Sequence, residues 1–366
     1  MKKMKNHENE PRRQSFSQRF AESKTLLLDG IRRIKARKDE LLSTPRGRRI
    51  ALASLAGLVL AVVIIIVALA SCRGGDEAKI PAGGTDPGTV AVLPKLGTAL
   101  ASLNLTPAPV DPAAPEKLTL SGNGHTLVFH ADSAAADLDG IPVALPGNAE
   151  IAPDGSWTIP EDAVSDLLQP ILSGSRIPVR TIVIDPGHGG DDRGASTAIG
   201  HREKDLNFLL ALELAKELRQ AGFQVALTRT GDRFVSLDQR PDFAAKQKAD
   251  LFVSIHHNAS ANNPDAAGPE VYVMAGKTPE QNAVSAKSCF TAFAMCQEFR
   301  SSEILPVRGV KRADFKVLRL SACPAVLVEA GFLTNPTEAN RLVTSSRRRA
   351  IASALAAAII RSVEKK

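Results

Sequence analysis

The 366-residue chain has few of the residues that build thiolate metal sites or disulfide frameworks. It contains four cysteines, Cys72, Cys289, Cys296 and Cys323, and no two of them have the C-x-x-C spacing of a structural zinc site. Cys289 and Cys296 would lie two turns apart on a helix, too far for a disulfide bond. We therefore expect the last three cysteines to be small core residues, and a disulfide that includes Cys323 stays open.

Aromatic residues are also scarce, at 4% of the chain, and the positive charge is confined to one end. The formal net charge is +7, yet residues 1–49 hold 15 lysines and arginines against six acidic residues, a local excess of +9. The rest of the chain is therefore close to neutral. Residues 1–49 contain only two aromatic side chains, Phe16 and Phe20, too few for a surface on which nucleotide bases stack. We expect no nucleic-acid partner.

One long segment has no charged side chain. It runs from Ile50 to Cys72, and an apolar helix of about 20 residues spans the core of a bilayer. The sequence RGRR stands directly before it, so the positive-inside rule places residues 1–49 in the cytoplasm as a basic arm. We predict a single-pass transmembrane helix over 50–71 in the inner (cytoplasmic) membrane, with the rest of the chain on the periplasmic or extracellular side. The ending LASC offers an alternative, a lipoprotein anchored at Cys72.

Two regions follow the apolar segment. Residues 73–115 are rich in glycine, proline and alanine without an apolar period, which predicts an extended linker. In residues 116–175, the short strand candidates TLVFH, IPVAL and SWTI are separated by the turn signals LDG and PDG. The stretch PEDAVSDLLQPIL then has the pattern of a helix. We interpret 116–175 as a small α+β module.

The remaining residues, 179–366, alternate between strand and helix patterns. The strand candidates are TIVID, FQVAL, LFVSIHH, EVYVM and AVLVE, and amphipathic or capped helices lie between them. Ser236 and Gln239 form a capping box, although Pro241 could delay or bend the helix they open. Asn335 caps the start of a terminal helix. This alternation predicts an α/β fold with a mixed, mostly parallel sheet flanked by helices.

Three of these strands end in residues that bind zinc in other proteins. They give His188, then His256 or His257, and finally Glu329, while Glu203 begins the first helix. Ligands of α/β sheets bind at the carboxyl ends of the strands, so these side chains could converge there. Two histidines and one glutamate form a three-ligand catalytic zinc set that leaves a position for water.

Each of these residues also has an ordinary structural interpretation. Glu203 could serve only to complement a helix N-terminus, and the paired histidines could be core residues. Glu329 is harder to explain structurally, because an acid after an apolar strand is costly unless it is paired or functional. It is therefore the candidate for moving protons. Spacing along the chain does not show whether the four residues meet.

Five sequence blocks, in order, give the chain a family resemblance. They are IDPGHGGDDRGA, REKDLN, LFVSIHHNAS, RGVKRADFKVLR and AVLVEAGFLTNP, and the likeness covers roughly residues 180–363. The region resembles the zinc-dependent N-acetylmuramoyl-L-alanine amidases of bacterial cell walls (Amidase_3). The resemblance implies that His188, Glu203 and His256 bind one Zn²⁺ ion and that Glu329 is the catalytic residue. His257 departs from the family pattern, which has a small residue there.

The resemblance also implies a substrate and a reaction. The substrate is peptidoglycan, and the reaction hydrolyses the amide between N-acetylmuramic acid and L-alanine with zinc-activated water. A non-catalytic peptidoglycan-binding scaffold and a zinc peptidase acting on stem peptides remain the alternatives. Two roles remain for Arg308: it contacts the substrate's peptide or carboxylates, or it forms a structural ion pair.

Overall fold

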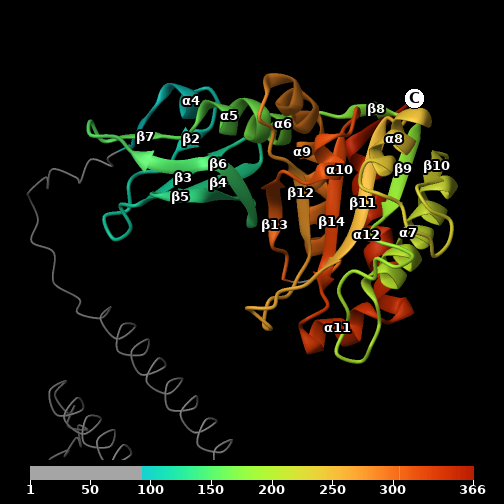
Figure 1. The fold of residues 1–366 in the computed structure, drawn as a ribbon. Coiled ribbons are helices and arrows are strands. Elements are labelled where there is room, and N and C mark those ends of the chain that lie inside the picture. The colour runs from blue at the N-terminus through green and yellow to red at the C-terminus, as the bar shows by residue number, and fades with distance from the viewer. Residues whose placement is uncertain (1–92, 305) are drawn as a thin grey trace, which may run out of the picture. The chain divides into compact units, whose positions relative to one another are not determined.

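The computed structural model describes residues 93–304 and 306–366 (Figure 1). These residues belong to one compact unit, Pro87–Lys366. The basic arm, the predicted membrane helix and the first part of the predicted linker, up to residue 92, lie outside the described residues. Within the described part, no helix has the length and apolar character needed to cross a membrane.

The C-terminal part is built on a mixed sheet in which four neighbouring strands are parallel. The strands lie in the order β10 (Gln224–Leu227), β9 (Thr181–Pro186), β11 (Leu251–Asn258), β14 (Ala325–Phe332), β12 (Glu270–Met274) and β13 (Gly309–Ala313). The first four are mutually parallel, β12 is antiparallel to β14, and β13 is parallel to β12. The predicted mixed, mostly parallel sheet is therefore confirmed. The apolar runs of β9, β11 and β14 fit strands that are covered on both faces.

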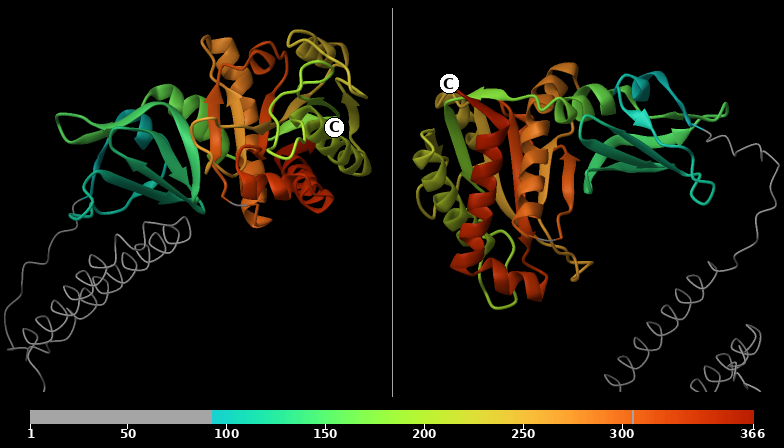
Figure 2. Two further views of the ribbon diagram at one scale, coloured as in Figure 1. Left: turned by 60° about the horizontal axis from the view of Figure 1, so that its bottom comes forward. Right: turned by 180° about the vertical axis from the view of Figure 1, so that it is seen from behind.

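Helices cover both faces of this sheet (Figures 1 and 2). On one face lie α7 (Glu203–Gln220), α9 (Pro279–Ser301) and α12 (Ser345–Ser362). The buried residues of α7 include Leu206, Leu210, Leu214 and Leu218, the i, i+4 pattern of its sequence. On the other face, the shorter helices α8 (Gln239–Lys246) and α10 (Lys316–Arg319) pack in a separate, smaller apolar cluster. This smaller cover leaves the carboxyl ends of the central strands accessible on that face.

Of the two predicted helix caps, the one at Asn335 is present, whereas the hydrogen bonds between Ser236 and Gln239 form ahead of the N-cap of α8, which is Asp238 and has no side-chain cap bond. The Ser236 N–H donates to Gln239 Oε1 at 3.1 Å, and the Gln239 N–H donates to Ser236 Oγ at 3.4 Å. Helix α8 begins at Gln239, so Pro241 lies in its first turn, where a missing N–H costs no intrahelical hydrogen bond. Asn335 accepts from the Glu338 N–H at the start of α11 (Pro336–Leu342).

The N-terminal module is a small antiparallel meander with short helices. Its central strands are β3 (Lys117–Gly122), β4 (His125–His130), β5 (Ser133–Leu138) and β6 (Ile141–Ile151). Strand β7 (Ser156–Thr158) pairs with the end of β6, and the helical turns α5 (Glu161–Ala163), η1 (Val164–Leu168) and α6 (Gln169–Leu172) follow. The short strand β8 (Ile177–Val179) pairs with the C-terminal β15 (Val363–Lys365).

The module begins earlier than the sequence analysis placed it. Strand β1 (Lys95–Leu96) pairs with β7, β2 (Thr106–Pro107) pairs with β3, and α4 (Thr98–Ala101) lies between them. The leucines of this segment, Leu100 and Leu103, are buried. From residue 93 onward, the segment expected to be linker is therefore part of the folded module. The elements here are only two to four residues long, too short for a recognisable period, so the composition rich in Gly, Pro and Ala suggested a linker.

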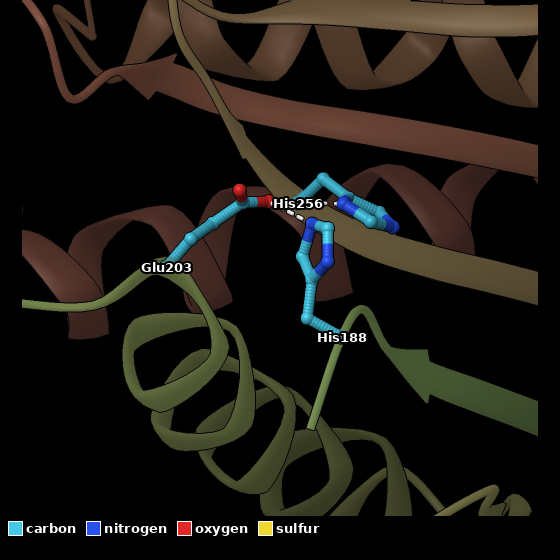
Figure 3. A group of neighbouring side chains, drawn as sticks. All are labelled: His188, Glu203 and His256. Carbon is cyan, nitrogen blue, oxygen red and sulfur yellow. Dashed lines mark hydrogen bonds and ion pairs between the residues drawn. The ribbon is translucent and has the colours of Figure 1, made fainter. Parts of the chain in front are cut away.

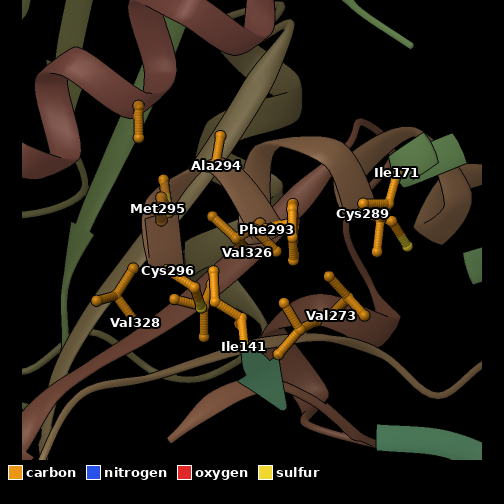
Figure 4. Close-up of a cluster of buried hydrophobic side chains, with 14 of the residues drawn as sticks. Ile141, Ile171, Val273, Cys289, Phe293, Ala294, Met295, Cys296, Val326 and Val328 are labelled. Atoms are coloured by element: carbon orange, nitrogen blue, oxygen red, sulfur yellow. The ribbon is translucent and has the colours of Figure 1, made fainter. Parts of the chain in front are cut away.

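The module and the C-terminal part share one hydrophobic core. Strand β6 pairs with β13 at Val143 and Val310, so the module's strands continue the main sheet. Figure 4 shows Ile141 and Ile171 of the module in the same cluster as Phe293 of α9 and Val326 of β14.

The cysteines of the C-terminal part are free. Cys289 and Cys296 are buried on α9, as expected for small core residues, and Cys323 is partly buried. The disulfide left open by the sequence is therefore not formed.

Candidate metal centre

The glycine-rich loop after β9 presents His188 at the carboxyl end of the sheet. His188 itself has a positive φ of 60°, the left-handed conformation that few non-glycine residues adopt. The preceding Gly187 touches the His256 ring so closely that a Cβ atom would lie 2.2 Å from Cε1. At Gly194, whose φ is 63°, a Cβ atom would lie 2.5 Å from Glu203 Oε2. These glycines are therefore needed for close approach as well as for the turn.

His188, Glu203 and His256 meet at this point (Figure 3). Glu203 Oε1 lies 3.1 Å from His188 Nε2 and 2.9 Å from His256 Nδ1. One ligand atom from each residue lies within 4.8 Å of the other two. The residues come from the loop after β9, the first turn of α7 and the end of β11. The structure thus brings together three residues that are widely separated in sequence, in an arrangement that could hold a metal ion.

Hydrogen bonds fix the orientation of these side chains. His188 Nδ1 lies 2.8 Å from Asp192 Oδ2, which leaves Nε2 directed at Glu203. Such a carboxylate partner on the far nitrogen holds a ligating histidine in the required tautomer. The Ala195 N–H and the Asn207 amide donate to the Glu203 carboxylate at 2.8 and 3.2 Å.

The electrostatics favour an ionised Glu203. Burial alone would raise the pKa of this carboxyl, but hydrogen bonds and positive charge from His188 and His256 hold its pKa well below the usual range. A buried carboxylate between two imidazoles stabilises a positive charge beside it. That charge can be a protonated imidazole or a bound cation.

His257 lies on the opposite face of β11 from His256, because successive side chains of a strand alternate. It is buried, and its Nδ1 lies 2.7 Å from Asn207 Oδ1. Burial lowers its pKa to about 4. His257 therefore contacts the residue that supports Glu203 and does not share the cluster of His188 and His256.

Two buried arginines and one buried aspartate hold the glycine loop from below. Arg240 donates to Asp185 Oδ1 at 2.8 Å, to the Pro186 carbonyl at 2.9 Å and to the His188 carbonyl at 3.0 Å. Arg229 donates to the carbonyls of Pro186 and Gly187. The sequence analysis missed these residues. The available signal was Asp185, a charged residue inside an apolar strand, which requires a buried partner.

Glu329 lies next to this cluster. On the neighbouring strand β14 it pairs in register with His256, so the two side chains lie on the same face of the sheet. Its Oε2 atom is buried and has no hydrogen-bond partner among the described residues. Burial, followed by the negative charges of Glu203 and Glu270, raises the pKa of Glu329 well above its ordinary value.

A pocket of about 280 Å³ opens over these side chains. His188, His256 and Glu329 line its polar end, and Phe234, Leu237, Phe315 and Leu327 contribute to its apolar wall. Glu329 thus lines a space that a small polar group can enter, while its Oε2 atom is itself buried. The arrangement can bind a cation and offer a proton acceptor beside it.

Comparisons with known proteins relate part of this chain to one family of enzymes. A family model described as N-acetylmuramoyl-L-alanine amidase matches residues 182–361. The chain is 31% identical over 225 aligned residues to the N-acetylmuramoyl-L-alanine amidase AmiA of Escherichia coli, which covers 50% of this chain and 75% of AmiA. It is 34% identical over 186 residues to the probable cell wall amidase LytH of Staphylococcus epidermidis, covering 50% of this chain and 58% of LytH.

Among solved structures, the amidase AmiC2 of Nostoc punctiforme is 35% identical, with 50% of this chain and 95% of AmiC2 covered and a TM-score of 0.45. The similarity to these proteins falls in the C-terminal half, and the chain spans 58% of the length of LytH. The module and the residues before it lie outside the matched family model.

Proposed function

This chain belongs to the N-acetylmuramoyl-L-alanine amidase family, and from that premise we propose that it hydrolyses the amide between N-acetylmuramic acid and L-alanine in peptidoglycan. The observation that carries the proposal is that four residues lie close together near the carboxyl ends of β9, β11 and β14. His188, Glu203 and His256 converge within ligand distance of one another, and Glu329 lies beside them with a buried, unpartnered oxygen. In the reaction, water adds its oxygen to the lactyl carbonyl and a proton to the departing amine.

The three converging residues fit a zinc ion. Two imidazole nitrogens and one carboxylate oxygen are the donor set of catalytic zinc sites, which keep a further position for water or substrate. When bound, zinc polarises a carbonyl group and lowers the pKa of water to about 7. The chain's part is to hold the donors in place, through the bond of His188 to Asp192 and the bonds to the Glu203 carboxylate.

Glu329 is proposed to move the protons. Its side chain lines the same pocket as His188 and His256, so a water molecule bound in that pocket would lie beside the Glu329 carboxyl group. As a carboxylate it accepts a proton from the attacking water. As the acid it then donates one to the amine nitrogen of L-alanine, which leaves as the C–N bond breaks. The buried setting keeps other water away from the carboxyl group.

We also propose where the reaction takes place. The charge-free segment from Ile50 to Cys72 would anchor the chain in the cytoplasmic membrane, by a helix over 50–71 or by lipidation of Cys72. The basic residues before it would stay inside, and the amidase part would reach the wall outside.

The function is tested with Glu329→Gln in the full-length chain, incubated with purified peptidoglycan. We expect this variant to keep its metal content and to lose turnover by at least about 100-fold, the lower range for a general acid–base residue. The wild type should release peptides with a free N-terminal L-alanine and leave the glycan intact, as read by mass spectrometry.

Other products would contradict the proposal. Cleavage within the stem peptide would indicate a peptidase, and binding without any product would indicate a scaffold. Undiminished release of L-alanine peptides by Glu329→Gln would remove Glu329 from the mechanism.

A further inference from the structure

A second charged group lies beside the proposed reaction centre and takes no part in the mechanism above. Glu270 on β12 pairs in register with Glu329, so both carboxyl groups project from the same face of the sheet. Arg308, directly before β13, donates from Nε to Glu270 Oε1 at 2.7 Å. The Arg308 side chain remains 40% exposed, whereas that of Glu270 is 5% exposed. The acid is therefore buried within the protein and the guanidinium faces outward.

The Glu270 carboxylate is held by two further donors. Asn258 Nδ2 donates to Oε2 at 2.9 Å, and the Tyr272 hydroxyl donates to the same oxygen at 2.8 Å. Tyr272 lies on β12 itself and Asn258 on β11, so the position of Glu270, and through it the position of Arg308, is fixed by hydrogen bonds from two strands of the sheet.

The guanidinium is fixed on two sides and open on a third. Its centre lies 5.2 Å from the centre of the Phe332 ring, over which it stacks, and its Nε is taken by Glu270. Within residues 93–304 and 306–366, neither Nη1 nor Nη2 of Arg308 donates a hydrogen bond. A guanidinium presents its two Nη groups as a planar fork that matches a carboxylate. Arg308 thus offers an oriented fork to the solvent.

The fork lies at a suitable distance from the proposed reaction. Phe332 is three residues beyond Glu329 on β14, and Glu270 is one strand away, which places the guanidinium roughly 5–10 Å from Glu329. An extended peptide covers about 3.3–3.6 Å per residue. A group on the second residue after the scissile amide therefore reaches Arg308 when that amide lies at Glu329.

We propose that Arg308 binds a free carboxylate of the stem peptide, one or two residues beyond the amide that is cleaved. This inference rests on the proposed function and adds a basis for substrate selection to it. The second residue of the stem peptide, a γ-linked D-glutamate, carries either a free α-carboxylate or the corresponding carboxamide. A carboxylate accepts two charge-assisted hydrogen bonds from the fork, whereas a carboxamide has a single acceptor oxygen and no charge.

The test uses the full-length chain and two synthetic L-alanyl-γ-D-glutamyl peptides, one with the free α-carboxylate and one with the carboxamide. Binding is measured by calorimetry, which needs no turnover. We expect the wild type to bind the carboxylate peptide about 10- to 100-fold more tightly, the range of hydrogen bonds to a charged group. Arg308→Gln should abolish this preference, and Arg308→Lys, which keeps the charge without the fork, should retain part of it. With muramoyl peptides as substrates, the same change should appear in KM and leave kcat nearly constant.

Arg361→Gln is the matched control. Arg361 forms an ion pair with Glu298 at 3.3 Å, its side chain is 43% exposed, and it lies at the end of α12, which covers the face of the sheet opposite to α8 and α10. This variant should keep the full preference.

The inference is overturned if the wild type binds the two peptides equally, or if Arg308→Gln weakens both to the same extent, as a purely structural ion pair would. A wild type that discriminates between the peptides but cleaves no muramoyl amide would instead contradict the proposed function alone.

Discussion

At the scale of single residues, the neighbours His256 and His257 are separated by the alternation of a strand. His256 faces the cluster with Glu203, while His257 turns into the protein and contacts Asn207. Asn207 in turn donates to Glu203 Oε1 at 3.2 Å. His256 is therefore proposed to bind the metal ion directly. His257 is connected only to the proposed ligand Glu203, by two hydrogen bonds that pass through Asn207.

We expect His256→Ala to lose the zinc ion and His257→Ala to retain it with reduced affinity. Outer partners of metal ligands typically contribute about 10- to 100-fold in affinity, so His257→Ala should fall in that range. Zinc affinity is measured by competition with a chromogenic chelator. The assignment fails if His257→Ala loses zinc entirely while His256→Ala keeps it.

The sequence alone singled out the three residues of the cluster and Glu329 beside it, but only part of their surroundings. His188 follows a strand and Glu203 begins a helix, where position in an α/β fold is informative. Strand β14 does not end at Glu329, as the sequence suggested, but continues to Phe332. The choice of His256 over His257 depended on the family resemblance. Asp192 and Asn207 could not be singled out from the sequence. Whether a polar side chain in a loop or helix bonds to a given residue depends on where the folded chain directs it, and the local sequence does not show this.

At the scale of elements, the glycine loop places His188, and its geometry depends on the absence of side chains. Gly187 packs directly against the His256 ring. Below the loop, Asp185 accepts from Thr228 Oγ1 at 2.6 Å and Ser254 Oγ at 2.9 Å, as well as from Arg240. These hydrogen bonds to the Asp185 carboxylate make the loop a rigid support for one proposed ligand.

Gly187→Ala should therefore displace His256 and sharply weaken zinc binding. The added Cβ would lie 2.2–2.7 Å from three atoms of the imidazole, and neither group can move without disturbing β9 or β11. Gly231→Ala is the control, because a Cβ atom there meets no atom within 4 Å. Isothermal titration with zinc should show near-normal affinity for the control. Normal affinity in Gly187→Ala would contradict the described packing.

The order of the helices and strands could be predicted from the periodicity of their apolar residues. The buried arginines that hydrogen-bond to the glycine loop could not. Apolar strands, the leucine repeat of α7 and the cap at Asn335 follow local rules, and the structure agrees with each. Arg229 and Arg240 are buried instead of exposed because they satisfy loop carbonyls. These hydrogen bonds join residues that are far apart in the chain, so the local sequence around Arg229 and Arg240 does not indicate them.

At the scale of the whole molecule, the module and the amidase part share one hydrophobic core, so we expect them to unfold as one cooperative unit. The shared core joins Ile141 and Ile171 to α9, and the Cys289 thiol donates to the Asp166 carbonyl across the same boundary. The only tryptophan, Trp157, is buried in the module. It thus reports on the module, while the thiols of α9 report on the amidase part.

Unfolding in urea should show coincident midpoints for Trp157 fluorescence and for thiol exposure. Burial raises the pKa of the Cys289 thiol to about 12, so this thiol stays protonated and unreactive at pH 8 until α9 unfolds. Ile141→Ala should lower both midpoints together, with a loss of about 2–5 kcal/mol in the free energy of unfolding. Ile151→Ala, on the same strand but 45% exposed, should change little. A fluorescence transition that clearly precedes thiol exposure would show that the two parts unfold independently.

The metal content of the purified full-length chain tests the central claim most directly. The protein is dialysed against buffer in which trace zinc is the only added metal, and zinc is then measured by inductively coupled plasma mass spectrometry. We expect one zinc ion per chain in the wild type. The control His201→Ala, which removes an exposed histidine of the same loop region, should also contain one. His188→Ala and Glu203→Ala should each contain close to none. Zinc retained in both of these variants, or absent from the wild type, would contradict the proposal that His188, Glu203 and His256 together hold the ion.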